Sequence, residues 1–369
     1  MAHQSFDRSH RTTTTLAERR MRNCAGSRLD LSGHVNRYGP PEAVLRALRT
    51  LSPRDLQAHP ADAASHLAER YAEVLGVDPD ELVAGRGPDE ALRAIAARAP
   101  RGSVAVILPA PAEVLSIFPG GGFRGPEGAT LSPLAMVEEA MDSADLVVMS
   151  NPHALTGVVL DPLVLAQIAN RHPASTLVVD ETDIEFLAEP GRSTFSSLVG
   201  TDAENVIVLR SVSEFSGMGS TRAGVAWSRD RYMLRVLFDP RFSSPISGLD
   251  VVATEAALAS RVWAEAVRRQ VAEDGGWLSH ALAPLGTVVE GNVATPFRCL
   301  VTDRAEELAA AFAREGVDVL LLGSAEGFGS PALRIAAPRV SERAAFTAAL
   351  HAVTAPARAI TALELGVAG

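Results

Sequence analysis

Carboxylate, hydroxyl and imidazole side chains follow short apolar runs of this 369-residue sequence, at the points where the runs end. The runs and the groups that follow them are Val104–Leu108 with Glu113, Leu146–Ser150 with His153, Leu177–Asp180 with Asp183, and Val206–Arg210 with Ser211, Ser213 and Glu214. Such carboxyl groups can act as general acids and bases, or can bind a cation. A turn at Gly87 and Asp89 opens a helical pattern, which is a ready site for an anion.

These apolar runs predict strands, and helical patterns lie between them. The predicted helices cover residues 41–51, 62–75, 89–98, 134–141 and 163–170. Strands that alternate with helices predict crossover connections and an α/β fold with a large, mostly parallel sheet. Because ligands of such sheets bind outside the carboxyl ends of the strands, we expect the polar groups to gather at one edge.

The pattern changes near residue 248. The elements predicted beyond it are a long helix over 249–275, an apolar stretch over 288–301, a helix over 306–315, strands near 317–322 and 332–336, and a last helix over 341–353. They predict a smaller α+β domain. The expected division is a flexible arm (1–27), an N-terminal segment of the small domain (28–45), the large α/β domain (46–247) and the small domain (248–369).

All 34 basic residues are arginine, and the sequence contains no lysine. A Schiff base to a lysine amine and a Walker-type phosphate loop are therefore excluded. The net charge of −10 argues against a nucleic-acid or anionic-membrane surface. Cys24 and Cys299 lie far apart, which does not suggest a disulfide framework. With no apolar run long enough to span a membrane and no signal-peptide pattern, we expect a cytoplasmic protein.

The order of these motifs resembles that of the class I and II aminotransferases, which are pyridoxal phosphate (PLP) enzymes of fold type I. The pattern is most similar to histidinol-phosphate aminotransferase and threonine-phosphate decarboxylase. The segments that carry the resemblance are 36–41, 67–79, 84–90, 151–157, 180–186, 211–224 and 333–335. The resemblance implies a fold with a large sheet domain and a smaller α+β domain. It also implies a homodimer that acts on a small amino-acid-like substrate.

The resemblance implies roles for residues that match the family's motifs. Asp180 would pair with the pyridinium nitrogen of PLP, and Arg222 with its phosphate. The other implied cofactor contacts are Ser211, Ser213, Gly87 and Asp89. Arg334 would bind a substrate carboxylate, with Asn36 and Tyr38 as further substrate-binding residues.

Several family positions carry other residues in this sequence. The Schiff-base lysine falls on Glu214, the stacking aromatic ring on Glu113, and the asparagine that bonds the pyridine hydroxyl on Ala154. Two family tyrosines fall on Asp183 and His59, and a phosphate-binding serine falls on Pro88, which has no N–H. The candidate catalytic residues are therefore Glu214, Asp183 and Glu113, with Glu214 as a general base of raised pKa.

These three side chains and Asp180 would place four carboxylates where a pyridine ring would lie. Carboxylates that close need a counter-charge. Neighbouring arginines, a cationic substrate group, or a divalent metal would supply it; the candidate metal ligands are Asp180, Asp183, His59 and His153. An amino acid with an amine or guanidine tail suits both the acidic patch and a carboxylate clamp at Arg334.

Three functions stay open on the sequence alone. The first is an aminotransferase-fold enzyme of a specialised biosynthetic pathway, which acts on an amino-acid-like carboxylate without lysine-dependent transamination. The second is an enzyme that uses PLP or pyridoxamine phosphate (PMP) with a non-lysine base. The third is a non-catalytic partner of an active aminotransferase. Plainer interpretations also stay open: Asp180 as a turn cap, Arg222 as a partner of nearby acids, and codon drift as the cause of the missing lysine.

Overall fold

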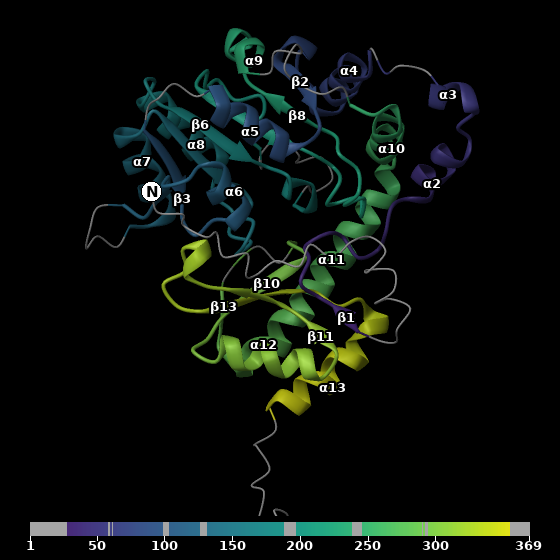
Figure 1. Cartoon of the computed structure of the whole chain (residues 1–369), viewed down its shortest axis with the longest axis vertical. Helices are drawn as coiled ribbons and strands as arrows, with labels where there is room; N and C mark the ends of the chain where they lie inside the picture. The colour runs from purple at the N-terminus through teal and green to yellow at the C-terminus, as the bar shows by residue number, and fades with distance from the viewer. Residues whose placement is uncertain are drawn as a thin grey trace, which may run out of the picture.

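The computed structural model describes residues 28–57, 60, 62–98, 103–125, 131–187, 197–237, 246–289, 291 and 294–354. These residues form two lobes, one built on a large sheet and the other on a smaller sheet (Figure 1). The arm predicted over residues 1–27 lies outside the described residues. Within the described ranges, no helix is long and apolar enough to cross a membrane.

The large lobe contains a seven-stranded sheet. In spatial order its strands are β2 (Leu82–Gly85), β8 (Gly224–Trp227), β7 (Val206–Arg210), β6 (Thr176–Asp180), β5 (Leu146–Ser150), β3 (Val104–Ile107) and β4 (Gly122–Phe123). The strands from β7 to β4 pair in parallel, whereas β8 is antiparallel to both of its neighbours. The prediction of a large, mostly parallel sheet is confirmed, although the two edge-side strands β2 and β8 were not predicted.

Helices cover both faces of this sheet, because neighbouring residues of each strand point to opposite faces. Val147 packs with helices α4 (Ala63–Leu75), α7 (Pro133–Ser143), α8 (Pro162–Arg171) and α10 (Gly248–Leu258). Val148 packs on the other face with α5 (Pro88–Arg98) and α9 (Arg231–Leu237). Ser132, Asp161 and Ser247 begin α7, α8 and α10, and each side chain accepts a backbone N–H of the first turn.

The small lobe contains a four-stranded antiparallel sheet. Its strands in spatial order are β12 (Leu320–Leu322), β13 (Ala332–Ala336), β10 (Phe297–Val301) and β9 (Thr287–Val288). A two-stranded parallel sheet joins β1 (Leu29–Asp30) to β11 (Val317–Asp318). Helices α12 (Ala305–Arg314) and α13 (Arg343–Thr354) cover the core, where the rings of Phe312 and Phe346 stack with centroids 5.8 Å apart.

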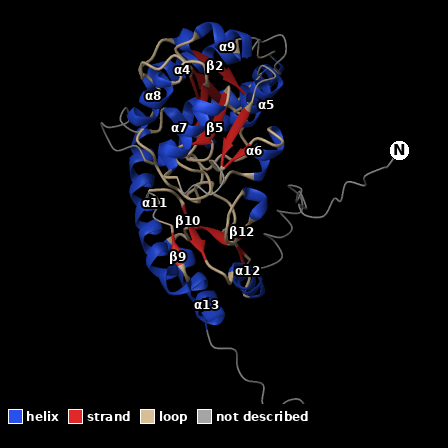
Figure 2. Cartoon of the chain, turned by 90° about the vertical axis from the view of Figure 1, so that its left-hand side faces the viewer, coloured by secondary structure: helices blue, strands red, loops and turns tan. Residues whose placement is uncertain are grey.

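The long helix predicted over residues 249–275 is two helices in the structure. The chain turns at Ala259 and Ser260, after α10, and α11 (Arg261–Leu282) then runs for 22 residues along one side of both lobes (Figure 2). The side chain of Ser260 bonds the carbonyl of Ala256, a local contact that competes with a regular helix. The remaining helices are α2 (Glu42–Arg49), α3 (Pro53–Gln57) and α6 (Ala112–Ile117).

Candidate active site

A cavity of about 420 Å³ lies at the carboxyl ends of the parallel strands, where both lobes contribute side chains. Its ionisable lining residues are His34, Asp89, Glu113, Asp180, Asp183, Glu214, Arg222, Glu326 and Arg334. Seven of these nine were candidate site residues on the sequence alone. The structure brings them together because the carboxyl ends of parallel strands meet at one edge of a sheet.

Asp180 is the last residue of β6, and its side chain closes a local turn. Its Oδ1 accepts the N–H of Thr182 at 2.9 Å and also the hydroxyl of Thr182. Burial raises the pKa of the Asp180 carboxyl, the two Thr182 bonds oppose that rise, and the charge of Asp89 adds to it. The turn-cap interpretation of Asp180 is thus correct for Oδ1, while the residue also lines the cavity.

Asp183 is a buried carboxyl group, and no described residue provides a counter-charge at bonding distance. Its side chain lines the cavity, the residue is 5% exposed, and Oδ1 has no hydrogen-bond partner among the described residues. Burial, followed by the charges of Glu214 and Asp180, raises the pKa of Asp183 to about 8. At neutral pH this carboxyl is therefore protonated, and it can donate a hydrogen bond.

Glu214 lies in the turn that follows β7, and the backbone N–H of Asn36 donates to its carbonyl oxygen at 2.9 Å. The side-chain Oε2 is buried without a hydrogen-bond partner in the described structure. Its nearest recorded basic atom, Nε2 of His34, is 3.8 Å away, which is too far for a hydrogen bond. Burial raises the pKa of Glu214, against the opposing charge of Arg222. A carboxylate of raised pKa is a suitable general base.

Arg334 extends from β13 of the small lobe into the same cavity. It donates to the carbonyl oxygen of Ala154 at 3.0 Å and to that of Ser32 at 3.2 Å. Its guanidinium carbon lies 5.3 Å from the ring centroid of Phe297. The Nε–H has no partner among the described residues. Because a guanidinium has five N–H donors, Arg334 keeps donors for a carboxylate.

Arg222 and Asp89 form an ion pair at the cavity rim, with 2.8 Å between Nη2 and Oδ2. Asp89 lies in the first turn of α5 and Arg222 comes just before β8. Both side chains are largely exposed, so the pair contributes little to stability. The plainer interpretation of Arg222, pairing with a nearby acid, is confirmed.

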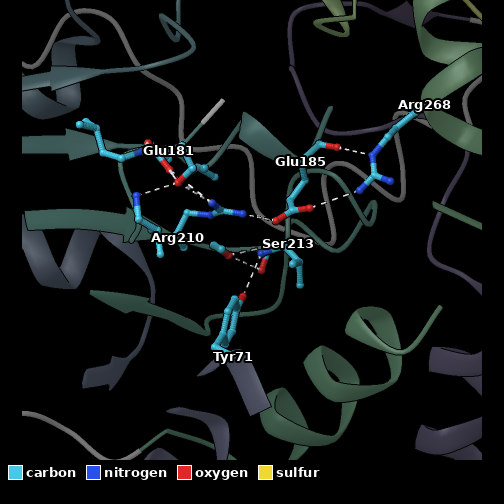
Figure 3. Close-up of polar contacts among 12 residues, drawn as sticks. Tyr71, Glu181, Glu185, Arg210, Ser213 and Arg268 are labelled. Atoms are coloured by element: carbon cyan, nitrogen blue, oxygen red, sulfur yellow. Dashed lines mark hydrogen bonds and ion pairs between the residues drawn. The ribbon is translucent and has the colours of Figure 1, made fainter. Parts of the chain in front are cut away.

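A buried polar cluster around Arg210 was not predicted from the sequence (Figure 3). Arg210, at the end of β7, lies 3.3 Å from the Glu181 carboxylate and also bonds the Glu185 carboxylate. Glu181 accepts from the hydroxyl of Ser197 at 2.6 Å, and Arg268 of α11 donates to the carbonyl of Glu185 at 2.7 Å. The cluster anchors the Asp180–Asp183 turn, because Glu181 lies within that turn and Glu185 lies two residues beyond it.

His34 is a second residue that sequence reasoning missed. It lines the cavity and packs edge-on against Phe297, with ring centroids 6.5 Å apart. Burial and the charge of Arg334 lower the pKa of His34 to about 3, so the ring is neutral. Its place two residues before Asn36, where a matched motif begins, was the available signal.

Five predicted contact residues are not among the residues that line the cavity. Asn36 donates to the carbonyl of Phe215 at 2.7 Å and accepts the N–H of Tyr38, and the Tyr38 hydroxyl donates to Asp274. The Ser211 hydroxyl bonds the carbonyl of Ala223, and Ser213 that of Thr221. Gly87 has a φ of 93°, so it serves the turn before α5. The structure shows these contacts within the chain, and the roles of the five residues in ligand binding stay predictions.

Three of the four suggested metal ligands, Asp180, Asp183 and His153, lie in the described part of the chain. Within the described residues, no three His, Cys, Asp or Glu side chains converge as a metal would require. His153 lies 2.8 Å from the carbonyl of Pro109 through Nε2, and Nδ1 accepts the N–H of Thr156 at 3.2 Å. Both ring nitrogens are thus engaged. His59 lies outside the described residues.

Asp183 makes stability dependent on pH. Its folded pKa, about 8, lies above its ordinary value of 3.8. Between these values the folded chain holds a proton that the unfolded chain has released. The contribution of this proton to the free energy of unfolding is complete below the ordinary pKa and is lost as pH rises through the folded pKa. The facing charged groups are Asp180, Glu214 and Arg334. We expect Asp183→Asn to flatten the fall in the free energy of unfolding over this range, measured by urea denaturation; parallel curves for variant and wild type would contradict it.

Comparison with known proteins finds similarity over most of the chain. The family model for aminotransferase class I and II matches residues 132–349. A histidinol-phosphate aminotransferase of Symbiobacterium thermophilum is 31% identical over 335 residues, which cover 87% of this chain and 89% of the relative. Another, of Dinoroseobacter shibae, is 29% identical and covers 70% and 72%.

Solved structures share the fold. The histidinol-phosphate aminotransferase of Sinorhizobium meliloti, in complex with pyridoxal-5'-phosphate, has a TM-score of 0.75 at 21% identity and covers 91% of this chain and 93% of its own. The L-threonine-O-3-phosphate decarboxylase of Porphyromonas gingivalis has a TM-score of 0.73 at 21% identity, with coverage of 88% and 98%. These similarities place the described lobes in fold type I.

Proposed function

Because the chain belongs to the class I and II aminotransferase family, we propose that it is an enzyme of that fold which binds an amino acid or similar carboxylate and works without lysine-dependent transamination. One observation carries this proposal. Three buried atoms without a described hydrogen-bond partner, Nε of Arg334, Oδ1 of Asp183 and Oε2 of Glu214, belong to residues that line a single cavity. Buried polar atoms are normally satisfied, so such a group points to a ligand.

The residues of this cavity do not fit PLP, the cofactor of the family. The chain has no lysine, so no side-chain amine is available for the cofactor's aldehyde. At the start of α5, Pro88 has no N–H, and the N–H of Arg86 bonds the Glu90 carboxylate at 2.7 Å. A phosphate beside Arg222 would also meet the negative charge of its partner Asp89. We therefore derive the chemistry from the side chains alone.

Arg334 supplies the recognition of the ligand's carboxylate. Its guanidinium is fixed by two carbonyl oxygens and by the ring of Phe297, which leaves its other N–H groups oriented before a ligand arrives. A fixed guanidinium binds a carboxylate through paired, charge-assisted hydrogen bonds. The neutral His34 beside it adds no competing charge.

Glu214 and Asp183 supply the acid and base. Both pKa values are raised, that of Asp183 to about 8, so near neutrality Asp183 holds its proton and Glu214 is the candidate base. Two coupled carboxyls with different environments commonly divide the roles of acid and base in this way. Glu214 accepts a proton from the bound ligand, and Asp183 donates a hydrogen bond to charge that develops on it.

Replacing Arg334 by glutamine tests carboxylate recognition. The probe is the amino acid that most raises the melting temperature in a thermal-shift screen. We expect Arg334→Gln to weaken its affinity about 10- to 100-fold, because charge-assisted hydrogen bonds are lost. Isothermal titration calorimetry gives both dissociation constants. The control is Arg304→Gln, which removes an exposed arginine paired with Glu307 on α12. Equal affinity in wild type and Arg334→Gln, or no hit in the screen, would refute the assignment.

A second candidate function is the one that the relatives' names give, histidinol-phosphate aminotransfer. Its support is the 31% identity over 87% of the chain. A titration with PLP decides between the two. We expect no new absorption band above that of free PLP, and no amino transfer from histidinol phosphate to a 2-oxo acid, since no lysine is present. A saturable band together with turnover would establish the second candidate instead.

We also propose the domain division 28–45 with 248–369 against 46–247, and a homodimer. Pairing of β1 with β11 supports the assignment of the N-terminal segment to the small lobe. The homodimer is supported by the family resemblance, and the native mass of the purified protein is the measurement that decides it.

A further inference from the structure

Resting on the proposed function for the carboxylate end, we propose that the ligand also carries a cationic tail, an amine or a guanidinium group, which binds against Asp180 and Glu214. The substrate class is then a basic amino acid. A site for a cationic group differs from a PLP pocket, which binds an anionic phosphate. The inference follows from how charge is distributed among the cavity's side chains.

The cavity is acidic beyond what its own arginines offset. Apart from Glu113 and Glu326, which have interactions of their own, four carboxyl groups and two arginines line it. Arg222 is already paired with Asp89 at 2.8 Å. Arg334 is already bonded to two carbonyl oxygens, and its charge acts on Asp183 and Glu214. The charged neighbour that acts on Asp180 is another carboxylate, Asp89.

Asp183 gives an independent sign of a missing partner. It is 5% exposed, it lines the cavity, and its Oδ1 bonds no described residue. Glu214 Oε2 is in the same condition. At Asp180, both Thr182 bonds end on Oδ1, and no described residue bonds Oδ2. Asp180 Oδ2 and Glu214 Oε2 are thus available to accept N–H donors from a cation, beside the buried Asp183.

An organic cation suits the carboxyl groups of Asp180, Asp183 and Glu214 better than a metal ion does. Among the described residues the carboxyl groups do not converge as metal ligands. Leu92, Val114, Leu155 and Leu322 line the same cavity, and such apolar side chains pack the methylene stem of a lysine or arginine. The volume of about 420 Å³ falls within the range of small-molecule sites.

Two matched pairs of ligands test the tail separately from the carboxylate. L-arginine and L-citrulline differ in the charge of the tail, as do L-lysine and L-norleucine. We expect at least one charged member to bind about 10- to 100-fold more tightly than its neutral partner, because hydrogen bonds to charged groups are lost in the neutral one. Isothermal titration calorimetry on the full chain at neutral pH measures all four affinities.

Variants locate the effect within the cavity. Asp180→Asn keeps an acceptor for Thr182 and should reduce the charged-to-neutral ratio, and Glu214→Gln should do the same if Asp180→Asn does not fold. Glu138→Gln is the matched control, since Glu138 pairs with Arg171 on the surface, outside the cavity lining. Its ratio should equal that of wild type.

The outcomes separate this inference from the proposed function. Agmatine, which is arginine without its carboxylate, should bind more weakly than L-arginine in wild type and equally well in wild type and Arg334→Gln. If agmatine binds wild type as tightly as L-arginine does, the carboxylate site is refuted and the site for the cationic tail is supported. If citrulline and norleucine bind as tightly as their charged partners, the site for the cationic tail is refuted and the carboxylate site is supported. If none of the five compounds binds at millimolar concentration, the site for the cationic tail is refuted.

Discussion

Replacing Arg210 by methionine is expected to lower the free energy of unfolding by about 3–5 kcal/mol, since a buried ion pair would lose one partner. Arg210 is 5% exposed and lies between the carboxylates of Glu181 and Glu185. Without the guanidinium, Glu181 would remain buried with only the Ser197 hydroxyl and the N–H of Leu198 as donors. Urea denaturation at neutral pH measures the loss.

A surface ion pair provides the control. Arg171 bonds Glu138 at 2.6 Å, but both side chains are about half exposed, at 51% and 45%. Arg171→Gln should therefore cost less than about 1 kcal/mol. If Arg210→Met costs no more than Arg171→Gln, the buried cluster does not hold the acidic turn in place.

Glutamine at position 214 should lower turnover of the bound amino acid by about 10²- to 10⁴-fold, the usual contribution of a general base. The amide keeps the shape of Glu214 but cannot accept a proton. Affinity should fall by no more than about tenfold, because the variant removes one of several groups that contact the ligand. Mass spectrometry of the amino acid consumed, beside calorimetry of its binding, measures the two effects.

The pH profile distinguishes catalysis from packing at this position. Burial raises the pKa of Glu214, so turnover by the wild type should lose activity as pH falls through that raised value. Residual turnover in Glu214→Gln should lack this acid limb. Wild-type turnover in the variant, with its acid limb retained, would assign the base to another residue. Glu138→Gln should leave the profile unchanged.

The parallel part of the large sheet was predictable because its strands are recognisable in the sequence. Leu146–Ser150 and Val206–Arg210 are continuous apolar runs, as expected for strands buried on both faces. β2 and β8 are four residues long and begin or end in glycine, so their pairing depends on contacts far along the chain. The break between α10 and α11 depends on a side-chain contact of Ser260 that periodicity does not reveal.

The proximity of carboxyl groups in the cavity was also predictable, because it follows from the topology of the sheet. Asp180 and Glu214 follow adjacent parallel strands, so they must lie near each other whatever their side chains do. Asn36 and Tyr38 are not among the residues that line the cavity, and a motif match does not say where a side chain points. The partner of Arg210 could not be inferred either, since an arginine within an apolar run does not reveal which acid it meets.

Helix α11 is held by side-chain contacts at two positions along its length. Arg268 ties its upper part to Glu185, just past the acidic turn, while Asp274, six residues on, receives Arg343 of α13 and the hydroxyl of Tyr38. A hinge motion of the whole small lobe would move α11 and strain the contact between Arg268 and Glu185. Because Glu185 lies two residues beyond Asp183, a displacement of α11 would act on the turn that carries this acid.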